Sequence, residues 1–154
     1  MTRADAELRL VVANKGLLEL VDIPTATDGT NQAIGLVLDD ALRRMGYSVS
    51  LTGNPSDADL AFVPSRRIPL FYQLANLLLL EFILGTMNSL PDEWASVNKI
   101  EWGRAIDALE RRIAREQKRL DPVLGTVPGN VASKPIWERP YPPDAIVEPW
   151  GGRS

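Results

Sequence analysis

The most apolar segment of the chain is residues 68–87, which read IPLFYQLANLLLLEFILGTM. A helix that is apolar on nearly all sides must be covered on nearly all sides. The segment therefore predicts a central helix, with Pro69 in its first turn and Gly85 at its end. Within residues 70–84 the clearly polar side chains are Gln73, Asn76 and Glu81.

Two kinds of cover other than the chain itself are conceivable for this helix. A membrane is one, but a bilayer span needs about 20 apolar residues, and this run is shorter and interrupted by polar side chains. We therefore expect no membrane partner. Neighbouring subunits are the other, and we expect them to share in the cover. Gln73, Asn76 and Glu81 would then make polar contacts between subunits or within the core.

Length and composition restrict the possible functions. At 154 residues, 45% of them apolar, the chain is about one domain and can build a core. A net charge of -3 argues against a surface devoted to nucleic acid, which is usually basic. The absence of cysteine and histidine removes thiol nucleophiles, zinc–thiolate sites and the commonest general base. We expect no metal and no cofactor.

Apolar periodicity predicts three further helices. Residues 4–21 have a mostly helical spacing that could break at Gly16, and residues 31–45 form an amphipathic helix, capped by Asp28 or Thr30 and stopped by Gly46. Residues 99–120 place Trp102, Ile106, Leu109 and Ile113 on one side.

Shorter segments complete this pattern. Residues 47–52 alternate apolar and polar side chains, which fits a short strand or an extended arm. A Ser/Asp cap on a short turn explains Asp57 and Asp59 better than a metal site does. Ser89 is expected to cap the first turn of a helix that follows the central helix. The sequence therefore predicts an all-α fold: a small four-helix bundle in residues 1–120, built around the central apolar helix.

Residues 121–154 form a different kind of segment. They hold seven of the twelve prolines, which disfavour helix, together with three aromatic residues, Trp137, Tyr141 and Trp150. We predict a long, extended, proline-rich C-terminal arm. Either the arm wraps over its own domain, or its aromatic residues bind pockets on a partner. We favour the partner because an arm of this length reaches beyond a small domain.

A basic stripe runs along the helix predicted at residues 99–120. It spans roughly 20 Å at 1.5 Å per residue and is interrupted by nearby acids such as Asp107, which is spaced to pair with Arg111. The stripe is either a solvated face or a track that faces a DNA channel or a neighbouring subunit. Its residues are Arg104, Arg111, Arg115 and Lys118.

Catalytic motifs are missing from the sequence. No nucleophile elbow, Ser-x-x-Lys pair or phosphate loop is present, and adjacent acids such as Asp39 and Asp40 do not face one another on a helix. We therefore predict that the protein is not an enzyme and assign no catalytic residue. If an enzyme used acids alone, Glu81 would be the first candidate.

The order of these parts resembles the head-to-tail adaptor proteins of tailed bacteriophages, also called head completion or connector proteins. The resemblance lies in the amphipathic segment 38–46, LDDALRRMG, followed by the apolar helix 70–84, a charged helix and an aromatic-bearing arm. It implies a small helical bundle that assembles as a ring, typically of twelve copies, beneath the portal in the virion neck, after synthesis in the host cytoplasm. Its partners would be the portal and a tail or second neck protein, and DNA would pass through the lumen without sequence recognition.

A different class of function fits the same features. A cytosolic helical regulator could bind a protein partner through the same C-terminal arm. The two classes differ in stoichiometry, because a regulator would form a one-to-one complex where an adaptor would form a ring.

Overall fold

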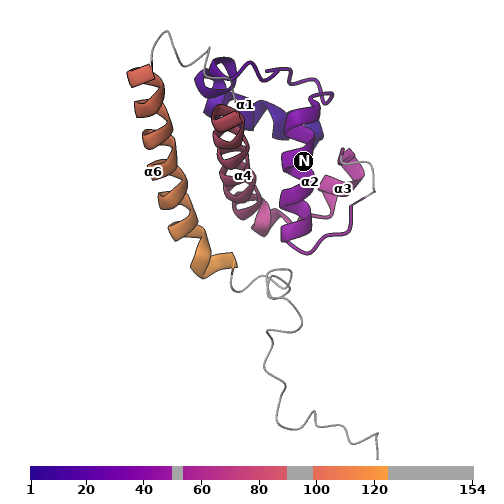
Figure 1. The fold of residues 1–154 in the computed structure, drawn as a ribbon. Coiled ribbons are helices and arrows are strands. Elements are labelled where there is room, and N and C mark those ends of the chain that lie inside the picture. Colours follow the sequence, from indigo (N-terminus) through magenta and orange to yellow (C-terminus); the bar gives the residue numbers. More distant parts are fainter. Residues whose placement is uncertain (50–53, 90–98, 125–154) are drawn as a thin grey trace, which may run out of the picture.

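The computed structural model describes residues 1–49, 54–89 and 99–124, and these residues form helices and connecting loops with no strand among them (Figure 1). The all-α prediction is confirmed for this part of the chain. The elements are α1 (Arg3–Leu20), α2 (Gln32–Arg44), α3 (Asp57–Ala61), the short 3-10 helix η1 (Ser65–Arg67), α4 (Ile68–Ser89) and α6 (Lys99–Leu124).

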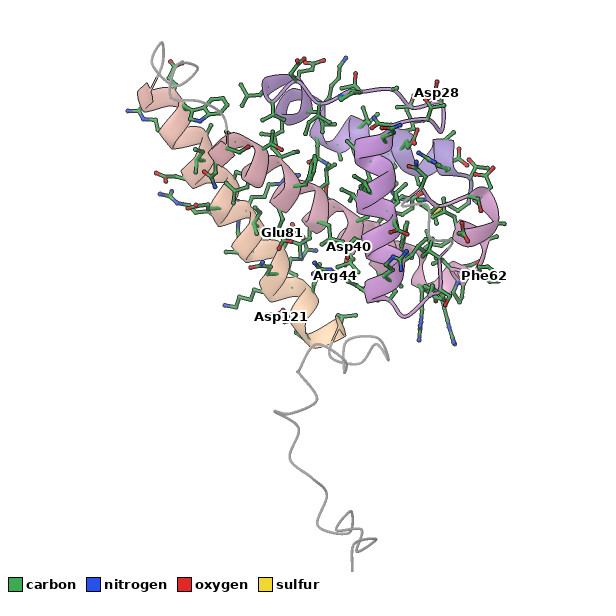
Figure 2. The ribbon with its side chains drawn as sticks, turned by 45° about the vertical axis from the view of Figure 1, so that its right-hand side comes forward. Asp28, Asp40, Arg44, Phe62, Glu81 and Asp121 are labelled. Carbon is green, nitrogen blue, oxygen red and sulfur yellow. The ribbon has the colours of Figure 1, made fainter. Side chains whose placement is uncertain are left out.

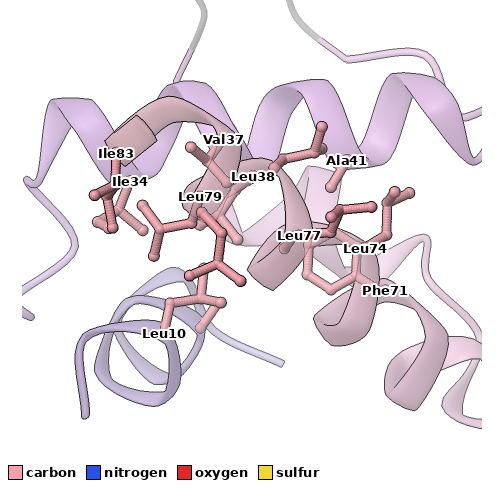
Figure 3. Packing of buried hydrophobic residues seen from close by; sticks show 14 of the residues in the cluster. Leu10, Ile34, Val37, Leu38, Ala41, Phe71, Leu74, Leu77, Leu79 and Ile83 are labelled. Carbon is pink, nitrogen blue, oxygen red and sulfur yellow. The ribbon is translucent and has the colours of Figure 1, made fainter. Parts of the chain in front are cut away.

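Helix α4 is the centre of the fold. It lies between α2 and α6, and α1 also packs against it (Figure 1). Figure 3 shows its apolar side chains interleaved with those of α2 and α1, including Val37, Leu38 and Leu10. The residues of α4 that the chain buries are Phe71, Leu74, Ala75, Leu77, Leu78, Leu79, Leu80, Ile83 and Met87.

The chain itself buries most of the apolar side chains of this helix. Phe82 is its one large hydrophobic residue with a strongly exposed side chain among the described residues, at 40%. Neighbouring subunits are therefore not required to bury most of the helix, and their share in its cover stays a prediction. Residues 65–89 are long and apolar enough to cross a membrane by length and composition, with a mean hydropathy of 1.6, but a buried core helix passes the same test.

The predicted end of α4 at Gly85 is wrong. A glycine inside a helix costs only about 1 kcal/mol, and the continuation buries Met87 to 2% exposure. The helix therefore runs on to Ser89, whose hydroxyl donates to the carbonyl of Thr86 at 2.9 Å. Ser89 thus ends this helix, and the helix predicted after it lies outside the described residues.

Helix α1 bends at Asn14 and not at Gly16. Asn14 has a non-helical backbone (φ -131°, ψ 15°) and is buried at 2% exposure. Its amide Nδ2 donates to the carbonyl oxygen of Leu10 at 3.0 Å and to Asn76 Oδ1 on α4 at 2.8 Å. A polar contact with another helix therefore accompanies the bend, which propensity along the sequence did not indicate.

Helix α2 begins at a cap other than the two predicted. Asn31 Oδ1 accepts from the backbone N–H of Ile34, while its Nδ2 donates to two loop carbonyls. Asp28 instead accepts from the backbone and hydroxyl of Thr30. The predicted stop at Gly46 is confirmed: its φ is 86°, and the next residue bonds back to the helix.

Helix α6 extends beyond the predicted boundary at residue 120. It ends at Leu124 and contains Pro122, which cannot donate a backbone hydrogen bond to the preceding turn. Only two helical residues follow Pro122, so a distortion there affects little of the helix. The sequence predicts a short strand or an extended arm at residues 47–52. Residues 47–49 form no strand, and residues 50–53 are outside the described part. The short turn after Ser56 is confirmed as α3, with a capping box made by Ser56 and Asp59.

A buried ion pair fastens the start of α1 to the loop before α2. The Glu7 side chain is fully buried and accepts from Arg3 Nε at 3.0 Å and from the backbone N–H of Gly29 at 2.7 Å. Arg3 Nη2 also donates to the carbonyl of Asn31 and to Asn54 Oδ1, each at 3.2 Å. Three segments distant in the sequence meet at this one guanidinium.

Candidate functional site

The basic stripe of α6 points away from the core. Its members, Arg104, Arg111, Arg115 and Lys118, are all exposed. The opposite side of the helix carries Leu109, Ile113 and Leu120, which are buried. Since successive residues are about 100° apart around a helix, the two sets occupy opposite faces, and the stripe faces solvent.

Few acids neutralise this stripe. The ion pair found in the described part of α6 joins Arg119 to Glu116 at 3.5 Å, and the pair predicted between Asp107 and Arg111 is not formed. The Nε of Arg115 donates instead to the carbonyl of Arg111 at 3.3 Å. The four cations therefore remain available to an anionic surface.

The three polar residues of α4 have separate environments. Glu81 Oε1 accepts from Gln117 Nε2 of α6 at 2.9 Å, and Asn76 bonds to Asn14 of α1. Gln73 is exposed beside Tyr72. Glu81 and Asn76 thus connect helices of the same chain. From the sequence alone, such contacts could form either within the core or between subunits.

An open apolar groove lies between α2 and α4. Its volume is about 330 Å³, and its walls include Leu36, 54% exposed, and Phe82, 40% exposed. Asp40, Arg44 and Glu81, which are labelled in Figure 2, also line it. Asp40 and Arg44 pair with each other at 3.2 Å. The sequence did not reveal this groove, because Leu36 and Phe82 come from helices far apart in the chain.

The shifted pKa values among the described residues have local causes. The lowered pKa of Asp5 and of Asp28 follows from hydrogen bonds with Thr2 and Thr30, as at ordinary caps and turns. Burial raises the pKa of Tyr72, and the nearby Arg9 opposes this change. Within residues 1–49, 54–89 and 99–124, no group of three or more acidic, histidine or cysteine side chains could hold a metal ion.

No known protein family matches the chain, and comparisons with curated proteins and with solved structures give no match either. The aromatic residues predicted to bind a partner, Trp137, Tyr141 and Trp150, lie outside the described residues. Among the described residues, the groove and the basic stripe are two surfaces that a partner could contact.

Proposed function

We propose that this protein is a structural adaptor of a tailed-phage neck, which assembles as a ring beneath the portal and connects the DNA-filled head to the tail. In this proposal residues 1–124 form a four-helix bundle, and the remaining residues form an extended C-terminal arm. The observation that carries the proposal is the placement of two contact surfaces of different chemistry on one small helical fold: an apolar groove and a solvent-facing basic stripe.

The groove suits a contact between copies of the chain. Leu36 and Phe82 together expose apolar surface beside the Asp40–Arg44 ion pair, an arrangement of apolar centre and polar rim that is typical of protein interfaces. The proposal does not rest on the cover of α4, because the chain itself supplies most of that cover. Ring assembly would use the exposed groove and leave the interior of the bundle unchanged.

The basic stripe suits a surface along which DNA passes. Its four cations have no acidic partner among the described residues, so they can contact phosphates without first breaking an ion pair. Acids on the same helix, such as Glu110 and Asp107, keep the total charge low. A channel of this kind would pass DNA without holding it and without reading its sequence.

The first experiment measures assembly. Light scattering coupled to size exclusion, on the full chain alone and mixed with the portal protein of the same virus, should give a species of many copies in at least one condition. Phe82→Ser should weaken that assembly. Phe62→Ser is a matched control, since Phe62 is 65% exposed at the end of α3 and does not line the groove.

A monodisperse monomer that does not bind the portal protein would refute the proposal. A one-to-one complex with another protein would favour the regulator. The arm is tested separately: deleting residues from Lys134 onward should leave the helical circular dichroism unchanged and abolish docking, as should the pair Trp137→Ala and Trp150→Ala. Unchanged docking would refute the role of the arm and leave the groove in place.

A further inference from the structure

A second cleft lies where α1, α4 and α6 meet, away from the groove. Its volume is about 260 Å³. Pockets for whole small molecules usually begin at about 300 Å³, so this cleft suits a side chain better than a cofactor. It is lined by Arg9, Leu10, Ala13, Pro69, Tyr72, Gln73, Asn76 and Arg112.

Two arginines from different helices line this cleft, and neither has a carboxylate partner within the described part of the chain. Arg9 comes from α1 and Arg112 from α6, and no ion pair of the described residues includes either one. Other arginines of the same part, such as Arg3, Arg43 and Arg44, each pair with an acid on their own helix. Two like charges that share a cleft repel each other, and an anion between them removes that repulsion.

Arg9 is held in an orientation that favours binding. Its guanidinium carbon lies 4.2 Å from the centre of the Tyr72 ring. A guanidinium that lies over an aromatic ring is attracted to the face of the ring, and its five N–H donors leave some available to a carboxylate. This contact restricts the Arg9 side chain and so reduces the entropy that Arg9 would lose on binding.

The amide of Asn76 adds a donor to the same cleft. Its Oδ1 is engaged by Asn14 Nδ2 at 2.8 Å, so its own NH₂ group is the end left to donate. No carboxylate lines the cleft. The nearest acid that affects Tyr72 is Asp5, whose carboxylate is held by Thr2 at the start of α1. The polar part of the lining is thus rich in donors.

We propose that this cleft binds the carboxylate of a glutamate or aspartate side chain on a partner protein. Arg9 and Arg112 would bind the two oxygens, and Leu10, Ala13 and Pro69 would contact the apolar part of the partner segment. Arginines also bind phosphate, but the apolar walls beside the two arginines suit the aliphatic part of a peptide segment better than a nucleic-acid backbone. The proposal does not depend on the adaptor function.

The test follows the arginine side chains of the full-length protein by ¹⁵N NMR at low ionic strength. A capped Ala-Glu-Leu peptide should shift the Nε signals of Arg9 and Arg112 and saturate in the millimolar range, whereas the matched Ala-Gln-Leu peptide should not. Arg9→Gln and Arg112→Gln should each weaken binding about tenfold or more, since each removes charge-assisted hydrogen bonds.

The control is the double variant Arg104→Gln, Arg115→Gln, which removes two exposed cations of α6 that do not line the cleft and should leave peptide binding nearly unchanged. Circular dichroism of each variant checks the fold. The proposal is overturned by an unsaturable shift, by equal shifts with the glutamine peptide, or by inorganic phosphate binding more tightly than the glutamate peptide.

Discussion

Replacing Arg3 with methionine should destabilise the fold far more than the same change at Arg44. Both arginines pair with an acid four residues away on their own helix, but they differ in burial. The side chains of Arg3 and Glu7 are 14% and 0% exposed, whereas those of Arg44 and Asp40 are 53% and 48% exposed. The two substitutions therefore each remove an arginine from an arginine–carboxylate pair, but the two pairs differ strongly in burial.

The expected magnitudes follow from that difference. Removing one partner of a buried pair leaves an uncompensated charge and costs about 3–5 kcal/mol. Arg3→Met also loses the hydrogen bonds to Asn31 and Asn54. Breaking an exposed pair costs about 1 kcal/mol or less. For a urea slope near 2 kcal/mol/M, the midpoint of Arg3→Met should fall by about 2 M, and that of Arg44→Met by about 0.5 M or less.

Urea unfolding, followed by the circular dichroism of the helices, measures the free energy of unfolding of both variants. The double variant Arg3→Met, Glu7→Gln should recover most of the loss, because a neutral amide oxygen can still accept from the backbone of Gly29 and no buried charge remains. If Arg3→Met is no less stable than Arg44→Met at an unchanged urea slope, the buried pair does not contribute more to stability than the exposed pair.

Two further predictions concern local structure. Hydrogen bonds with Thr2 are the main cause that holds the pKa of Asp5 below its ordinary value of 3.8. The contribution of Asp5 to stability is therefore present above pH 3.8 and is lost as the pH falls through the lowered folded pKa. A carboxyl NMR titration should show this lowered midpoint, and Thr2→Ala should move it toward 3.8. Gly35→Ala should destabilise the fold by about 1–3 kcal/mol in thermal unfolding, because the added Cβ would overlap Asn54 Oδ1. Gly103→Ala, with nothing within 4 Å of the added Cβ, should be neutral or stabilising by up to about 1 kcal/mol.

Apolar spacing predicted where the helices lie, but not where they bend or end. The spacing of Leu109 and Ile113 identified the buried side of α6, and Gly46 identified the end of α2. The extension of α4 past Gly85 was missed, because the burial of Met87 by other helices outweighs the low helix propensity of one glycine.

The polar contacts were the least predictable part. Glu7 reads as an ordinary surface acid near the start of a helix, yet it is fully buried by Arg3 and Gly29. Arg9 and Arg112 are separated by about a hundred positions and carry no motif, so only the packing of α1 and α6 against α4 brings them to one cleft. Sequence patterns report periodicity along one helix and contain no direct information about which helices become neighbours.

The apolar segment 68–87 was sufficient to predict a central helix, because so apolar a helix must be buried wherever it folds. The tertiary structure decided which elements cover this helix. Helices α1, α2 and α6 of the same chain pack against it, and Phe82 remains exposed at the groove. An apolar composition implies that a segment is buried, but not by which neighbours. Which helices become its neighbours depends on how the loops return them, and the arrangement brings together residues far apart in the sequence, such as Asn14 with Asn76 and Gln117 with Glu81.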